Sequence, residues 1–172
     1  PEFLIATGRS INKERMKDQY VVLRAMAFLM LHRGEFKDIP ALQYRGDIDD
    51  FLARFMVYVN DNAPEKLIVD YENLFIRCMQ ISYDLLGENG FRFSGNGIRR
   101  PINMPLFEAL SYLFSFVPEK IDYTWVSRLI LDIESVKEEF DDSRYFSGNI
   151  DSTTSVSFRF DRMDKIINRI QL

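Results

Sequence analysis

The sequence predicts an all-α protein of about six helices around one core, with strands at most minor. Apolar residues recur in steps of three and four along several segments, and residues that typically begin or end helices border those segments. The length agrees with this prediction, because 172 residues fit one domain that can bury an ample core.

Composition narrows the functional classes. The chain is 47% hydrophobic and 28% charged and holds 15 Phe and 8 Tyr, which excludes a disordered protein. The longest stretch without a charged residue, 109–118, is too short to cross a membrane. With His32 as its single histidine and Cys78 as its single cysteine, the chain cannot form an internal disulfide or a metal cage of these residues. We therefore expect no enzymatic activity, metal or cofactor in this chain alone.

The first predicted helix begins at a cap, Asn12, and runs to about Arg33, where Gly34 provides a stop. Residues 20–31 are apolar almost all round, with Arg24 as the exception. A surface helix carries one apolar stripe, so we expect this segment to be a central helix wrapped by its neighbours.

Two further helices follow. Asp47 and Asp50 form a capping arrangement for a helix over 48–60. Its buried side is expected to consist of Phe51, Leu52, Phe55, Met56 and Val59. The sequence Asn62-Ala63-Pro64-Glu65, with the asparagine as cap, predicts a third helix that ends at Gly87. The apolar residues of that helix step by four and three, at Leu67, Tyr71, Leu74, Cys78, Ile81 and Leu85.

The chain changes character between Gly87 and Pro101, which we predict to be a Gly- and Arg-rich loop with a short hairpin around Phe91 and Phe93. Asn103 then caps a fourth helix over 104–117 that is apolar enough to be buried.

The last two predicted helices carry opposite charges. One, over 123–140, is acidic on its outer side, and the other begins near Thr154 or Ser155. The second of these helices has a basic flank made of Arg159, Arg162, Lys165 and Arg169. We expect the two helices to dock through these charges.

Two charged residues lie inside otherwise apolar helices. They are Arg24 in the first helix and Glu108 in the fourth. An unpaired buried charge costs several kcal/mol, so we expect the two side chains to form a buried ion pair, directly or through one intermediary.

Two segments can be interpreted either as ligand-binding sites or as purely structural features. One segment is Gly95-Asn96-Gly97, which Arg99 and Arg100 follow, and it is able to bind an anion. Such a sequence is more commonly a glycine-rich surface loop without a ligand. The acidic cluster at 47–50 is able to hold a cation, but helix capping explains it better.

Four stretches of the chain carry a resemblance to a known family. They are Arg15-Met16-Lys17-Asp18-Gln19 leading to Val22-Leu23-Arg24; Asp50-Phe51-Leu52 with Phe55-Met56; Phe91-Arg92 followed by Arg99-Arg100-Pro101-Ile102-Asn103 and Leu106-Phe107-Glu108; and Ser155-Val156-Ser157-Phe158-Arg159-Phe160. In their order and spacing they resemble the helical C-terminal part of the ParB/sulfiredoxin-like family of domains of unknown function. That family occurs in GmrSD-type, modification-dependent restriction systems and related phage-defence proteins.

The resemblance implies a two-part parent protein in the bacterial cytoplasm. In such proteins an N-terminal ParB-like domain carries an Asp-Gly-Gln-Gln-Arg motif associated with nucleotide binding and hydrolysis, and many members add an HNH-type nuclease domain. This chain contains neither, so the implied NTPase or endonuclease is the parent, and the chain is its non-catalytic helical scaffold. The implied partners are the neighbouring ParB-like domain and, through the parent, DNA, with no membrane.

The resemblance also carries over particular positions as places where the scaffold meets its neighbour domain or DNA. They are Arg92, Arg99, Arg100 and Asn103 in the loop, and the segment 155–160 with its Arg159. Pro1-Glu2-Phe3 look like a scar left by an expression vector, so we expect 4–172 to be a single helical domain taken from a larger protein.

Two other functions stay open on the sequence. A stand-alone protein-interaction module predicts a large exposed apolar patch. A DNA-contacting module predicts salt-sensitive binding that falls when Arg99 and Arg100 become alanine.

Overall fold

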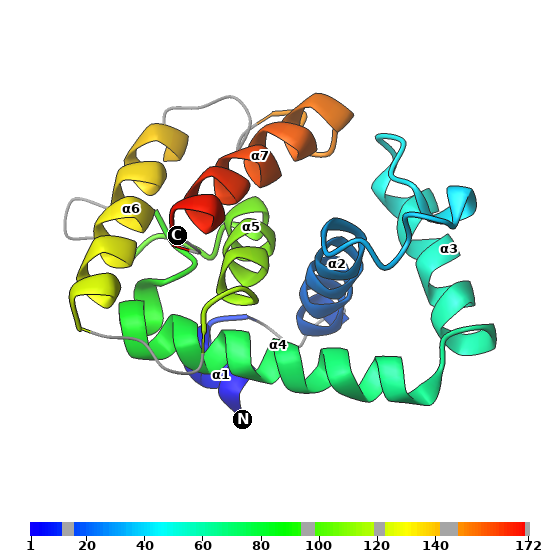
Figure 1. The fold of residues 1–172 in the computed structure, drawn as a ribbon, viewed down its shortest axis with the longest axis horizontal. Coiled ribbons are helices and arrows are strands. Elements are labelled where there is room, and N and C mark those ends of the chain that lie inside the picture. Colours follow the sequence, from blue (N-terminus) through cyan, green and yellow to red (C-terminus); the bar gives the residue numbers. More distant parts are fainter. Residues whose placement is uncertain (12–15, 94–98, 119–122, 142–147, 171–172) are drawn as a thin grey trace.

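The protein, in a computed structural model, is described over residues 1–11, 16–93, 99–118, 123–141 and 148–170. It forms seven α-helices and is 74% helical, with no strand among these residues, which confirms the predicted all-α class (Figure 1). The helices are α1 (Glu2–Ala6), α2 (Lys17–His32), α3 (Ile48–Asp61), α4 (Glu65–Leu86), α5 (Met104–Phe114), α6 (Tyr123–Asp141) and α7 (Thr153–Ile170), with short 3-10 turns η2 (Pro40–Leu42) and η3 (Gly87–Asn89).

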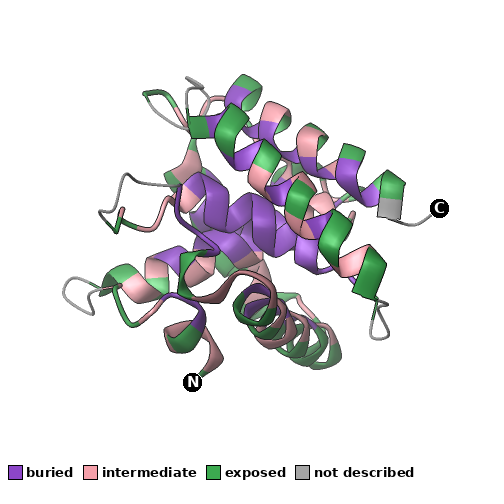
Figure 2. Cartoon of the chain, turned by 90° about the vertical axis from the view of Figure 1, so that its left-hand side faces the viewer, coloured by how far each residue is buried: buried purple, intermediate pink, exposed green. Residues whose placement is uncertain are grey.

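Helix α5 is the centre of the core. Every residue from Pro105 to Phe114 is buried, and α2, α4 and α7 pack around the helix (Figure 2). The ring of Phe107 lies 4.4 Å from that of Phe91 and 6.3 Å from that of Phe75, between ring centroids. The fourth predicted helix is therefore buried, as its apolar sequence requires.

Helix α2 is less enclosed than predicted. Its residues Val21, Ala25, Phe28 and Leu29 are buried, but the opposite side, with Val22, Leu23 and Met26, is only half-buried. Apolar residues all round the helix thus reflect two different environments, the core on one side and a groove on the other.

Two helix starts differ from the prediction. Met16 adopts a left-handed backbone conformation, with φ of 56°, so α2 begins at Lys17, and the predicted cap Asn12 lies outside the described residues. The N-cap of α4 is Pro64, which has no side-chain cap, whereas Asn62 ends α3. Asn62 is a typical capping residue, but it lies two positions before the observed N-cap. The predicted cap is therefore wrong, and the predicted helix is confirmed.

The predicted hairpin around Phe91 and Phe93 is wrong. Both side chains are buried, and the residues form no strand. The backbone N–H of Asn103 donates to the carbonyl oxygen of Phe91 at 3.0 Å, which holds this loop against the start of α5.

The first helix, α1, was not predicted, because residues 1–3 were set aside. Helix α1 packs on α4, and the ring of Phe3 lies 5.9 Å from that of Phe107 and 6.4 Å from that of Phe75, between ring centroids. The side chain of Phe3 thus extends the aromatic core.

The predicted docking of α6 and α7 is confirmed for two of the four basic residues. Arg162 pairs with Glu139, and Arg169 Nη1 lies 3.3 Å from Asp132 Oδ1. Within the described residues, no helix combines the length and the apolarity that a membrane span needs.

Candidate functional site

The structure brings Arg24 and Glu108 together in the core. Glu108 is fully buried, and its Oε1 accepts a hydrogen bond of 2.5 Å from Nε of Arg24. Its Oε2 accepts from Nη2 of Arg159 at 3.2 Å, so one carboxylate joins arginines from α2 and α7. The sequence pointed to the first arginine but placed the second on the flank facing α6.

Asp151 completes this buried charge cluster. Its two carboxylate oxygens accept from Nη1 and Nη2 of Arg24 at 3.3 and 2.7 Å. Its carbonyl oxygen accepts from the Tyr44 hydroxyl at 2.5 Å. Two arginines and two carboxylates balance in charge, and together they fasten α2, α5 and the entrance to α7.

Burial and charge oppose each other in this cluster. Burial raises the pKa of the Glu108 carboxyl, and the positive charges of Arg24 and Arg159 act to lower it. Burial acts to lower the pKa of the Arg24 guanidinium, but Glu108 and Asp151 outweigh it and hold that pKa above its ordinary value. The cluster is therefore held by its own internal pairing, and its role is structural.

Arg92 is likewise structural rather than a contact residue. Its guanidinium is buried and donates to the carbonyl oxygens of Glu88 at 3.2 Å and Thr7 at 3.1 Å, and also to that of Arg100. These bonds tie the end of α1 to the loop that leads into α5. The prediction that Arg92 and Arg159 meet DNA or another domain is corrected for the same reason, because both side chains are buried and occupied within the fold.

Asn103 also has an internal role. It is the N-cap of α5, and its Oδ1 accepts from the backbone N–H of Leu106 at 2.9 Å. The capping prediction is confirmed, whereas a contact of this half-buried residue with a partner stays a prediction.

Replacing Asn103 by alanine is expected to lower the free energy of unfolding by about 1 kcal/mol, because the N–H of Leu106 loses its acceptor. Urea unfolding followed by circular dichroism measures the change. Asn103→Ser keeps an acceptor and should recover most of the loss. Equal losses for serine and alanine would contradict the capping role.

Of the five predicted contact residues, Arg99 is exposed and Arg100 and Asn103 are half-buried, whereas Arg92 and Arg159 are buried. Arg99 Nη2 lies 2.8 Å from Glu88 Oε2, and Arg100 pairs with Asp141. Arg100 also stacks on the ring of Phe93, with 5.4 Å between the guanidinium carbon and the ring centroid. Each charge is thus met by a carboxylate, and residues 95–97 of the predicted anion cradle lie outside the described residues.

Of the two chemically versatile side chains, Cys78 is buried and His32 is half-buried. Burial raises the pKa of the Cys78 thiol to about 12, which keeps it protonated. The ring of His32 stacks on that of Phe160 with 3.5 Å between centroids. No group of three or more His, Cys, Asp or Glu side chains that could hold a metal occurs within the described part of the chain. The acidic residues at 47–50 act in helix capping, where Asp47 accepts from the N–H of Asp50.

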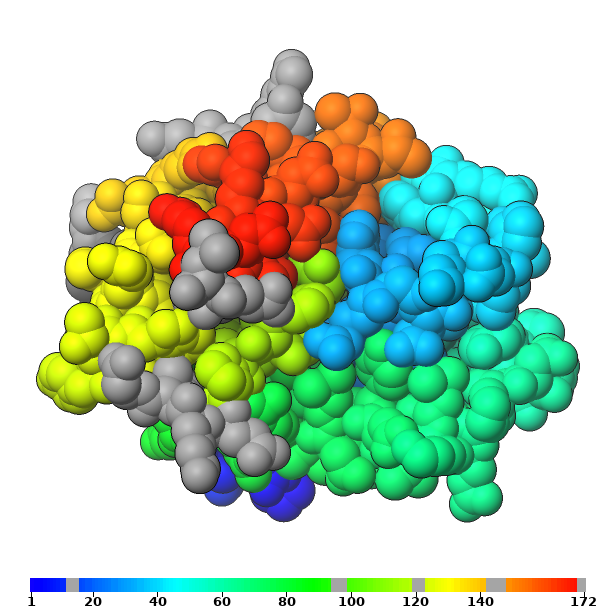
Figure 3. Space-filling model, in the orientation of Figure 1, coloured from blue at the N-terminus to red at the C-terminus, as the bar shows by residue number. Residues whose placement is uncertain are grey.

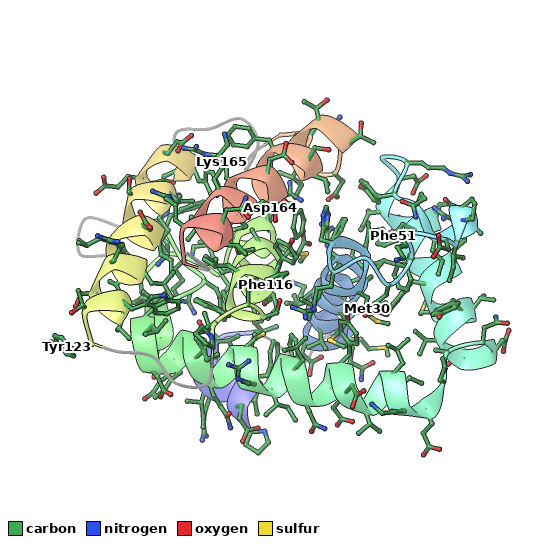
Figure 4. All side chains as sticks on the ribbon, viewed as in Figure 1. Met30, Phe51, Phe116, Tyr123, Asp164 and Lys165 are labelled. Atoms are coloured by element: carbon green, nitrogen blue, oxygen red, sulfur yellow. The ribbon has the colours of Figure 1, made fainter. Side chains whose placement is uncertain are left out.

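An apolar groove with a volume of about 1000 Å³ lies between α2, α3 and α4. Sequence reasoning did not predict it. Its lining residues are Phe3, Met16, Lys17, Asp18, Gln19, Tyr20, Val22, Leu23, Met26, Met30, Asp49, Phe55, Met56, Val59, Ile68 and Tyr71. Figure 4 shows one of them, Met30, in the space between α2, α3 and α4. Four of the seven methionines of the chain therefore lie in this one groove.

Exposed apolar side chains occur on both walls, α3 and α4, and two of them, Met56 and Ile68, line the groove. Met56 is 44% exposed and Val57 is 58% exposed on α3, and Ile68 and Val69 are exposed on α4. Met56 and Val59, which were predicted to lie on the buried side of their helix, instead face the groove. The buried side of α3 consists of Phe51, Leu52 and Phe55, and the ring of Phe51 lies 5.4 Å from that of Phe28 on α2.

Comparison of the chain with protein-family models, with curated proteins and with solved structures found no match.

Proposed function

We propose that this chain is a non-catalytic helical scaffold module of a DNA-targeting bacterial defence protein, as its resemblance to GmrSD-type systems implies. In this proposal the groove is the surface that packs on the ParB-like, nucleotide-hydrolysing domain of the same polypeptide. The observation that carries the docking role is the groove itself, which is open, almost wholly apolar and rich in methionine. Such a surface is typical of a protein-interaction site, because a large exposed apolar patch is costly in water until a partner covers it.

The position of α1 supports docking within one polypeptide. Phe3 lines the groove, so a domain joined ahead of Leu4 would be tethered at its edge. A short tether raises the effective concentration of the docking surfaces to about the millimolar range. Even a weak contact would then be occupied most of the time.

The remaining surface favours this function over direct DNA contact. The two arginines of the loop that are not buried are already paired with Glu88 and Asp141, and the chain has a net charge of −4. DNA binding draws its affinity mainly from unpaired basic groups that neutralise phosphates. The DNA-targeting step therefore belongs to the parent protein in this proposal.

The test starts from the gene. We expect an Asp-Gly-Gln-Gln-Arg motif upstream of Leu4, and we expect the separately purified ParB-like domain to bind this chain in calorimetry. Two matched double variants locate the contact. The groove variant, Met26→Gln with Met56→Gln, should weaken binding about tenfold or more, because it places two amides on an apolar contact.

The control is the outer variant, Tyr123→Gln with Leu131→Gln, which changes two exposed apolar residues of α6, at 88% and 71% exposure. Helix α6 lies on the side of the molecule away from α3 (Figure 1). The outer variant should bind within about twofold of the unmodified chain. Absence of the upstream motif, or equal binding by both variants, would overturn the proposal.

A further inference from the structure

The groove has the length of a short helix. Its floor runs along α2 from Lys17 to Met30, a span of about 20 Å at about 1.5 Å per residue. Helices α3 and α4 form its walls. An amphipathic helix of three to four turns has about this length, and docking of its apolar face in a groove is a recurring mode of recognition.

The lining suits aliphatic side chains in this mode. Met16, Met26, Met30 and Met56 are flexible and polarisable, so they adjust their shape to the residues that press against them. The lining residues that carry a charge are Lys17, Asp18 and Asp49. A helix with a continuous apolar stripe therefore matches the groove better than a polar ligand does.

The two helices that form the walls of the groove carry an excess of acidic residues, of which Asp49 lines the groove itself. Segment 48–72, which forms α3 and the start of α4, carries a net charge of −4, equal to that of the whole chain. Its bases are Arg54 and Lys66, and its acids are Asp49, Asp50, Asp61, Glu65, Asp70 and Glu72. Arg54 pairs with Asp50 at 2.7 Å and Lys66 with Asp70 at 2.6 Å, between nitrogen and oxygen. The other four carboxylates have no ion-pair partner within the described part of the chain.

Helix α3 and the first turns of α4 form one end of the molecule (Figure 3), and these four carboxylates are exposed on those two helices. Unpaired negative charge repels the phosphates of nucleic acids and of anionic lipids. It attracts lysine and arginine, and such complementarity sets the choice and orientation of a partner.

We propose that the occupant of the groove is an amphipathic helix whose apolar stripe lies along α2 and whose flanks carry lysine or arginine. The inference rests on the proposed function in one respect, that the helix belongs to the ParB-like domain. The chemistry of the groove is independent of that assignment.

The test uses synthetic peptides of about 16 residues. One is a helix with leucines on a single face and lysines on both flanks, a second has glutamates in place of the lysines, and a third has the same composition as the first with the leucines distributed all round. Methyl-labelled methionine reports the binding site by NMR. We expect the resonances of Met16, Met26, Met30 and Met56 to shift, and those of Met79, Met104 and Met163, which lie outside the groove, to stay.

The lysine-flanked peptide should bind about tenfold or more tightly than the glutamate-flanked one at low salt, and added salt should narrow the ratio. Removing two of these negative charges, in the variant Asp49→Asn with Glu72→Gln, should also reduce the ratio of the two peptide affinities. The matched control is Asp161→Asn with Glu138→Gln, two exposed acids elsewhere, which should leave the ratio within about twofold. The groove variant should weaken binding of the lysine-flanked peptide, and the outer variant should leave that binding unchanged.

Equal binding of the three peptides, or shifts spread over all seven methionines, would overturn the inference. Its failure is distinguishable from that of the proposed function. Groove-dependent binding of the ParB-like domain without binding of the lysine-flanked peptide overturns the helix alone. Binding of the peptide in the groove without binding of that domain upholds the helix chemistry and overturns the assignment of the partner.

Discussion

Substituting Glu108 by glutamine is expected to lower the free energy of unfolding by about 3–5 kcal/mol. The carboxylate is fully buried and accepts from Arg24 at 2.5 Å and from Arg159 at 3.2 Å. A glutamine side chain has one oxygen to accept with, and its amide group can only donate, so it faces one of two arginines with the wrong group. Two buried guanidinium groups, those of Arg24 and Arg159, would then face a neutral side chain in place of a carboxylate. Urea unfolding, followed by the fluorescence of Trp125, measures the loss.

A matched variant at the surface distinguishes the effect of losing a buried charge from the effect of losing any charge. Glu139→Gln breaks the pair with Arg162, whose side chains are 42% and 31% exposed, and should change the free energy of unfolding by less than about 1 kcal/mol. A double variant, Arg24→Met with Glu108→Gln, should recover part of the loss, because it removes one of the two guanidinium charges that Glu108 no longer neutralises. Equal stability of Glu108→Gln and the unmodified chain would contradict this account.

The sequence predicted those parts of the fold that depend on local patterns. Asp47 and Asn103 were identified as caps because their residue types and positions are local signals, and both accept the expected backbone N–H. Arg24 and Glu108 were matched because each is a charge inside an apolar helix, which requires a partner. The burial of Arg159 could not be predicted in this way, because the residue lies among other basic residues in the sequence. Only the folded chain shows that its side chain points into the core.

The groove could not be predicted from helical periodicity. The pattern on α2 indicates that both sides of the helix are apolar. It does not indicate whether a neighbouring helix of the same chain covers each side. That depends on how the helices pack in three dimensions, for example on the position of α3, whose Phe51 ring contacts that of Phe28 at 5.4 Å between centroids. The apolar residues of α2 at 22, 23 and 26 look the same in the sequence whether a helix of this chain covers them or they line a groove.

The second large effect concerns pH. Burial, followed by the positive charge of Arg159, lowers the pKa of His32 from 6.5 to about 3. The folded protein therefore keeps this imidazole neutral down to about pH 3, whereas the unfolded chain takes up a proton as the pH falls below 6.5. The stability that depends on a neutral His32 is complete above pH 6.5 and decreases as the pH falls. Each pH unit costs at most about 1.4 kcal/mol, and we expect about 2 kcal/mol between pH 6.5 and 4.5.

The variant His32→Phe isolates this effect. A phenyl ring can keep the stacking on Phe160, which is nearly parallel at 8°, and it replaces an Nε2 that is buried without a hydrogen-bond partner among the described residues. At pH 7 the variant should match the unmodified chain within about 1 kcal/mol. At pH 4.5 it should be the more stable of the two by about 2 kcal/mol beyond any difference at pH 7, because its unfolded state binds one proton fewer. Carboxylates that titrate in the same range are common to both proteins and cancel in the difference. Parallel stability curves from pH 7 to 4.5 would show that the folded protein protonates His32 as readily as the unfolded chain does.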